Sequence, residues 1–134
     1  MDGLKFHHVG YATKDLKKSI SDFEKLGYEN TGGFTDEVQN VKISIMERER
    51  FPIIELVKPN GNNNPVERFL VDYETITYHI AYLTKTFNKH IAELRNNGFF
   101  PTTRILKAVA FENRNFIFFH SANAGFIELL DNSI

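Results

Sequence analysis

The chain repeats itself, and this duplication limits the folds open to its 134 residues more than any other feature. Residues 8–28 align with residues 79–99 at an offset of 71, without a gap. Seven aligned pairs are identical, namely His8/His79, Tyr11/Tyr82, Thr13/Thr84, Lys14/Lys85, Lys18/Lys89, Ile20/Ile91 and Gly27/Gly98. The ends of the halves match too, because residues 54–57 align with residues 127–130 at an offset of 73. Such self-similarity predicts two copies of one supersecondary unit.

Each half has the pattern of a strand, a helix and further strands. Alternating apolar residues predict strands, and apolar residues at helical spacing followed by glycine predict a helix and its end. In the first half we expect Asp15 or Thr13 to cap the N-terminus of the helix, and Gly27 to end the helix. The expected elements are a strand at 6–12, a helix at about 16–26, strands near 38–46 and 52–57, then a strand at 77–83, a helix at 87–96, and strands near 108–111, 115–120 and 125–130. Each half is thus βαβββ or close to it.

The length predicts one domain, with repeat 1 at residues 5–58, a linker at 59–75 and repeat 2 at 76–132. The formal net charge is −1, so no basic surplus indicates nucleic acid as a partner. The chain has no cysteine, which excludes disulfides and thiolate metal ligands. No apolar run is long enough to cross a membrane, and the first residues lack the apolar core of a signal peptide. We therefore expect a cytoplasmic enzyme or binding protein.

The duplicated residues include two histidines and two glutamates, His8, Glu55, His79 and Glu128. Both glutamates lie inside apolar strands, where a carboxylate is costly unless it is paired, hydrogen-bonded or metal-bound. Taken singly, a strand histidine is more often structural, and a strand glutamate can face solvent from the wet side of a sheet. The duplication of both residue types favours a metal site instead. His7, His90 and His120 have no counterpart in the other half, and we expect them to be structural or exposed.

These residues resemble the glyoxalase / bleomycin-resistance / dioxygenase superfamily, also called vicinal oxygen chelate proteins. The resemblance covers essentially the whole chain, and its carriers are residues 8–10, 54–56, 79–81 and 127–130. It implies an α+β fold in which two βαβββ modules form a curved mixed sheet around a metal. It also implies His8, Glu55, His79 and Glu128 as ligands of a divalent Zn, Ni, Co, Mn or Fe, and it implies a homodimer.

Two enzyme families within the superfamily are similar to this chain. Methylmalonyl-CoA epimerases are similar in residues 64–70, in 78–82 and in Glu37-Val38, but they have His-Pro-Lys where residues 119–121 read Phe-His-Ser. Lactoylglutathione lyases (glyoxalase I) are similar in length and in the four ligands, with Glu55 in place of the epimerases' frequent glutamine. Their usual Asp-Pro-Asp-Gly turn is replaced by residues 121–125.

Both resemblances imply removal of a proton next to a carbonyl, with an acyl-CoA thioester or a hemithioacetal as the small-molecule substrate. Glu128 is the expected base as well as a ligand, Glu55 is its symmetric alternative, and Glu37 is a third candidate. Two other classes stay open. One is a metal-free protein that binds a drug or another small molecule, which would not need all four ligand types. The other is an Fe(II) dioxygenase, which normally uses two histidines and one glutamate.

Overall fold

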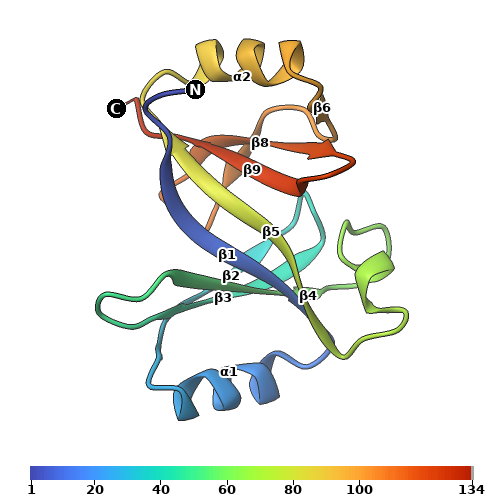
Figure 1. Ribbon diagram of the computed structural model, residues 1–134. Coiled ribbons are helices and arrows are strands. Elements are labelled where there is room, and N and C mark those ends of the chain that lie inside the picture. The colour runs from blue at the N-terminus through green and yellow to red at the C-terminus, as the bar shows by residue number, and fades with distance from the viewer. Residues whose placement is uncertain (134) are drawn as a thin grey trace. The chain divides into compact units, whose positions relative to one another are not determined.

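The computed structural model describes residues 1–133 and has the α+β architecture expected from the sequence, with nine strands in a mixed sheet and two α-helices (Figure 1). No helix within these residues is long and apolar enough to cross a membrane. In chain order, the elements are β1 (Lys5–Thr13), α1 (Leu16–Lys25), β2 (Glu29–Asp36), β3 (Val41–Glu47), β4 (Ile53–Pro59), the 3-10 helix η1 (Glu67–Leu70), β5 (Thr75–Thr84), α2 (Phe87–Asn96), β6 (Phe100–Pro101), β7 (Leu106–Ala108), β8 (Arg114–Ser121) and β9 (Gly125–Asp131).

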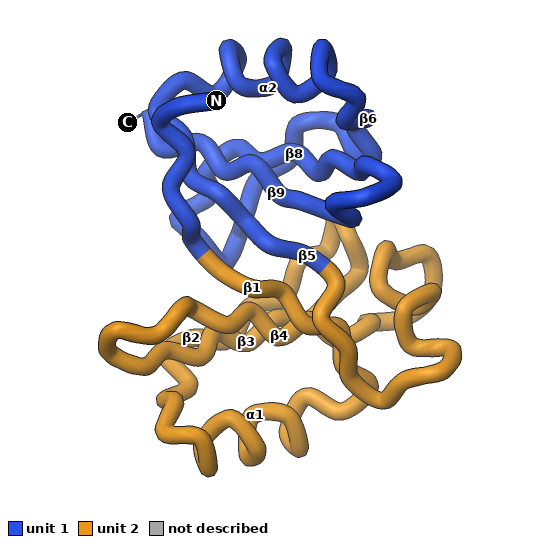
Figure 2. The backbone as a smooth tube through the Cα atoms, in the orientation of Figure 1, with its two compact units in different colours: residues 1–7, 79–134 blue, residues 8–78 orange. Residues whose placement is uncertain are grey.

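The chain divides into two compact units, residues 8–78 and residues 1–7 with 79–134 (Figure 2). In the first unit the strand order is β2-β3-β4-β1, with β4 antiparallel to β3 and parallel to β1. In the second the order is β5-β9-β8-β6, with β9 antiparallel to β8 and parallel to β5, while β7 also pairs with β8. Each unit therefore returns its last strand beside its first, which is the structural form of the repeat seen in the sequence.

Helix α1 begins and ends as the sequence predicts. The Asp15 carboxylate caps it by accepting a hydrogen bond from the Lys18 backbone N–H at 3.0 Å. Gly27 follows the helix with φ of 91°, a left-handed conformation that glycine adopts without strain. The apolar stripe of the helix packs on the strands, where a core of Met46, Ile54 and Leu56 contacts Leu16, Ile20, Phe23, Tyr11, Tyr28 and Val9.

The second unit has a core on each face of β8, because neighbouring residues of a strand point in opposite directions. Ile117 and Phe119 pack with Phe87 and Leu94 of α2 and with Leu129. Phe116 and Phe118 pack on the other face, in a cluster completed by Ala108 and Leu130. The run of aromatic residues in β8 is therefore buried on both sides. This packing fixes which face of β9 is turned away from α2, the face that carries Glu128.

Two expected strands differ from the structure, and β2 was missed. Residues 38–40 form a turn instead of the start of a strand, because the buried Asp36 carboxylate accepts hydrogen bonds from the N–H groups of Val38 and Gln39. Residues 109–113 also form a turn, with φ of 61° at Glu112 and 55° at Asn113, so β7 ends at Ala108. Strand β2 was missed because Asn30 and Gly32-Gly33 are typical of loops and most of this edge strand is exposed.

The identical pair Thr13/Thr84 ties the end of a strand to the helix that follows it in both units. The Thr13 hydroxyl lies 2.6 Å from the buried Ser19 hydroxyl in α1. In the other unit the Thr84 hydroxyl bonds Nδ1 of His90, which occupies the equivalent position in α2. The Asp2 carbonyl can only accept, so His90 Nε2 donates to it at 2.9 Å, and in the neutral ring Nδ1 accepts from Thr84. His90 is thus a structural residue, as expected.

Replacing Thr84 with Val should lower the free energy of unfolding by about 1–3 kcal/mol, because it leaves a buried His90 nitrogen without its donor. Urea unfolding of the purified protein measures this loss as a lower midpoint at an unchanged slope. The control is the same substitution at Thr35, which is exposed in β2 and should shift stability by no more than about 0.5 kcal/mol. Equal midpoints for the Thr84 variant and the wild type would contradict the proposed role of this hydrogen bond.

Candidate metal centre

In the first unit, the register of two parallel strands places a histidine beside a glutamate. Gly10 of β1 pairs with Glu55 of β4, and His8 lies two residues before Gly10 on the same face of the strand. His8 Nε2 is 3.5 Å from Glu55 Oε1. Both residues are buried, with 0% and 7% of their surface exposed. The pair is therefore shielded from bulk water.

The second unit repeats this arrangement. Ala81 of β5 pairs with Glu128 of β9, and His79 lies two residues before Ala81 on the same face. His79 Nε2 is 3.2 Å from Glu128 Oε1, and the two residues are 2% and 4% exposed. The same residue types at the same register thus form a second buried pair.

The register also explains why the sequence shows two offsets. His8 and His79 are 71 residues apart, whereas Glu55 and Glu128 are 73 residues apart, yet each glutamate pairs with the residue two positions after its histidine. Strand pairing is therefore the same in both units, and the two additional residues lie between the helix and the last strand. The paired residues are Gly10 and Ala81, both buried and small, so neither adds bulk beside the histidine and glutamate.

The surroundings of both glutamates are apolar. Glu55 pairs across β3 and β4 with Ile45, and Glu128 pairs across β8 and β9 with Phe118. The His79 and Phe118 rings pack perpendicular to each other, with ring centroids 4.9 Å apart. This positioning role of Phe118 was not predicted, although the aromatic run in β8 was visible in the sequence. A carboxylate in such surroundings must be stabilised by partners or by a cation.

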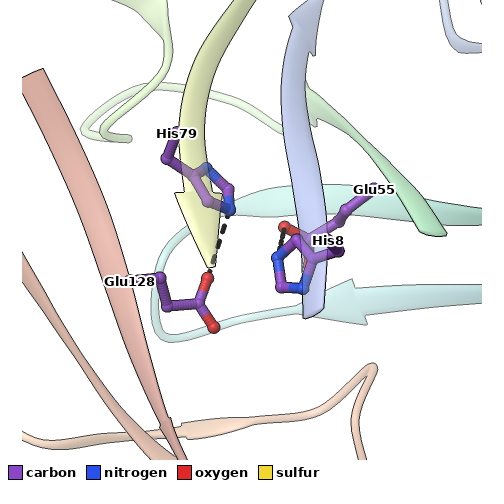
Figure 3. Close-up of side chains that lie close together, drawn as sticks. All are labelled: His8, Glu55, His79 and Glu128. Carbon is purple, nitrogen blue, oxygen red and sulfur yellow. Dashed lines mark ion pairs between the residues drawn. The ribbon is translucent and has the colours of Figure 1, made fainter. Parts of the chain in front are cut away.

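The distances within each pair fit two ligands of one metal ion. Donors about 2.1 Å from a metal lie about 3.0 Å apart at a right angle and about 3.4 Å apart at the tetrahedral angle. The observed separations are 3.5 Å and 3.2 Å. One ligand atom from each of the four residues lies within 4.8 Å of the others, so the group can hold a metal ion (Figure 3). Two imidazoles and two carboxylates suit first-row transition metals.

The remaining sequence candidates lie elsewhere in the described chain. His7 stacks edge-on against Phe111, and His120 lies against Phe126, with ring centroids 4.8 Å and 4.6 Å apart. Glu37 is exposed in the turn between β2 and β3, next to the buried Asp36. None of these residues belongs to a group of metal-ligating side chains within residues 1–133.

Solved structures with a similar fold include three from bacteria. Methylmalonyl-CoA epimerase from Mycobacterium tuberculosis has a TM-score of 0.83 and 21% identity, over 94% of this chain and 86% of that one. A Streptomyces coelicolor methylmalonyl-CoA epimerase variant, in complex with 2-nitronate-propionyl-CoA, has a TM-score of 0.84 and 18% identity, over 97% and 98%. A hypothetical protein from Bacillus halodurans C-125 has a TM-score of 0.84 and 23% identity, over 96% and 94%. At these identities the likeness is one of fold.

A comparison with curated proteins finds no match. The family model of the glyoxalase/bleomycin resistance protein/dioxygenase superfamily matches residues 7–118, which span β1 to the middle of β8 and include three of the four candidate ligands. The match covers most of the chain, and the paired βαβββ topology agrees with it. The chain therefore belongs to the glyoxalase/bleomycin resistance protein/dioxygenase superfamily.

Proposed function

We propose that this protein is a divalent-metal-dependent enzyme that removes a proton from a carbon next to a carbonyl, in the manner of methylmalonyl-CoA epimerase. In this proposal, His8, Glu55, His79 and Glu128 hold the metal. The observation that carries the proposal is the duplicated, buried histidine–glutamate pair, whose four ligand atoms lie within 4.8 Å of one another. Membership of a superfamily that contains metal-dependent enzymes supports it.

A metal in this group would supply Lewis-acid stabilisation of the negative charge that develops on the carbonyl oxygen. The residues of the chain supply the rest. Glu128 turns one carboxylate oxygen toward His79 Nε2, and its carboxylate is the group that takes up the proton in this proposal. The perpendicular packing of the Phe118 ring against the His79 ring restricts the orientation of the imidazole. Glu55, which faces His8 in the first unit, is the alternative candidate for the base.

The carbon atom, and the face of it, to which the proton returns decides which reaction takes place. Return to the opposite face of the same carbon is epimerisation, whereas return to the neighbouring carbon isomerises a hemithioacetal. The fold similarity supports epimerisation, since one of the similar structures is methylmalonyl-CoA epimerase in complex with methylmalonyl-CoA and NH4+. The presence of Glu55 in a full second pair favours lactoylglutathione lyase, because a lyase of this family uses four such ligands.

Replacing His79 or His8 with Ala should remove the metal, because each variant loses a ligand and metal affinity depends on the ligand count. Metal content of the purified protein, measured by elemental analysis after loading and desalting, should fall from about one ion per chain to near none. The control is His120 to Ala, since His120 lies against Phe126 outside the group. A double His8/His79 variant that kept full metal content, with a native circular dichroism spectrum, would refute the proposed centre.

Replacing Glu128 with Gln should slow proton exchange by about 10²–10⁴-fold, the usual contribution of a positioned base. Proton NMR in deuterated buffer follows the loss of the α-proton signal of the acyl-CoA thioester, at equal metal content for each variant. Glu112 to Gln, at an exposed turn position, is the matched control and should exchange like the wild type. If Glu55 to Gln were the slow variant and Glu128 to Gln exchanged normally, the base would be Glu55.

The same NMR measurement identifies the substrate class. The metal-loaded protein should exchange the α-proton of methylmalonyl-CoA and convert one epimer into the other. It should leave the hemithioacetal of methylglyoxal and glutathione unchanged, because only one of these two substrates carries the thioester. Turnover of the hemithioacetal without exchange on the thioester would replace epimerisation with the lyase reaction.

A further inference from the structure

A cavity of about 350 Å³ lies where α2 begins, within the unit formed by residues 1–7 and 79–134. Three lysines from three successive parts of this unit line it, Lys5 from β1, Lys85 from the loop before α2 and Lys89 from α2. Asp2 is the one acidic residue in its lining. The cavity thus has a surplus of positive charge that the proposed metal chemistry does not use.

The repeat gives this cavity an internal comparison, because Lys85 and Lys89 are the counterparts of Lys14 and Lys18. In the first unit both lysines have acidic partners. Lys14 Nζ is 3.6 Å from Glu74 Oε1, and Lys18 Nζ is 4.0 Å from Asp15 Oδ2. The cavity around Lys18 is lined by Asp15, Asp22 and Glu74. The first unit therefore neutralises its two lysines.

The second unit lacks most of these acids. Thr86 stands where the first unit has Asp15, and Lys89 keeps one exposed ion pair, with Glu93 at 3.8 Å. Within residues 1–133, the ammonium groups of Lys5 and Lys85 make no ion pair or hydrogen bond. The same lysines thus occur in both repeats, but Lys85 lacks an acidic partner like the Glu74 of Lys14, and the acid at the position of Asp15 is replaced by Thr86. Positive charge without a protein partner suits an anionic ligand.

The two strands that carry His79 and Glu128 also lead to this cavity. Leu83 lines it and lies four residues after His79 on β5, roughly 13 Å along the strand and on the same face. Asn132 lines it from the position that follows β9, four residues after Glu128. A ligand that reached from His79 and Glu128 to this cavity would need its anionic group at the end of a long arm.

We propose that this cavity is a subsite for the phosphate groups of an acyl-CoA, an inference that rests on the proposed function. Coenzyme A carries its phosphates at the far end of a long, flexible pantetheine arm, with the reacting thioester at the other end. Lysine binds phosphate as a point charge and needs no fixed approach geometry. A glutathione adduct, in contrast, has carboxylates close to its reacting carbon and no phosphate.

The test compares two double alanine variants that remove equal charge from the two repeats, Lys5/Lys85 and Lys14/Lys18. The Lys5/Lys85 variant should raise KM for the acyl-CoA about fivefold or more and leave kcat unchanged, which is the signature of a lost contact away from the reacting atoms. The Lys14/Lys18 variant should keep both constants. Because all four lysines are exposed, both variants should fold.

Calorimetric binding of coenzyme A and 3′-dephospho-coenzyme A separates this subsite from the catalytic proposal, because neither probe carries an acyl group. We expect the Lys5/Lys85 variant to bind coenzyme A at least fivefold more weakly than the Lys14/Lys18 variant, and added salt to reduce the difference. Equal dissociation constants for the two variants would overturn the proposed subsite. The proposed reaction would not be affected, because the proton-exchange experiment tests it independently. Absence of exchange with a retained lysine effect would overturn the proposed reaction instead.

Discussion

The parallel pairing of the first and last strands within each unit is the constraint on which the rest of this structure depends. It sets Glu55 opposite Gly10 and Glu128 opposite Ala81, and strand alternation then places a histidine on the same face, two residues away. A shift of one residue in either pairing would move the glutamate to the helix-covered face of its sheet. The geometry of the candidate centre is therefore a property of backbone register, and the side chains follow from it.

Because Glu55 and Glu128 are buried, their carboxylates need stabilising partners. A carboxylate at 4% or 7% exposure, beside Phe118 or Ile45, has lost most of its hydration and must be compensated by hydrogen bonds, an ion pair or a metal. The helices contribute by burying the opposite face of each sheet with side chains such as Phe23 and Leu94. The two faces of each sheet thus differ, with apolar packing on the face that the helix covers and the buried histidine–glutamate pair on the other.

Much of this organisation could be predicted from the sequence. The repeat, both helices, the fold class and the family are confirmed, because they depend on periodic patterns and on paired residues such as Thr13 and Thr84. The four candidate ligands were chosen by duplication, and the structure brings them close together. Strand β2 escaped prediction because Gly32-Gly33 has no apolar alternation, and the turn at 38–40 depends on hydrogen bonds of Asp36 that only a three-dimensional structure reveals. Nor could the sequence reveal that Phe118 stands against His79, since strand pairing brings these residues together.

The difference between the two offsets has a consequence for how such proteins change. The second unit accommodates two more residues between its helix and its last strand than the first, yet the pairing beside its glutamate is unchanged. Connections between strands can therefore lengthen or shorten without disturbing the buried histidine–glutamate pairs. A scaffold of this kind can change the length of its loops while the paired side chains keep their places, so chains that share little sequence can retain one arrangement of buried polar residues.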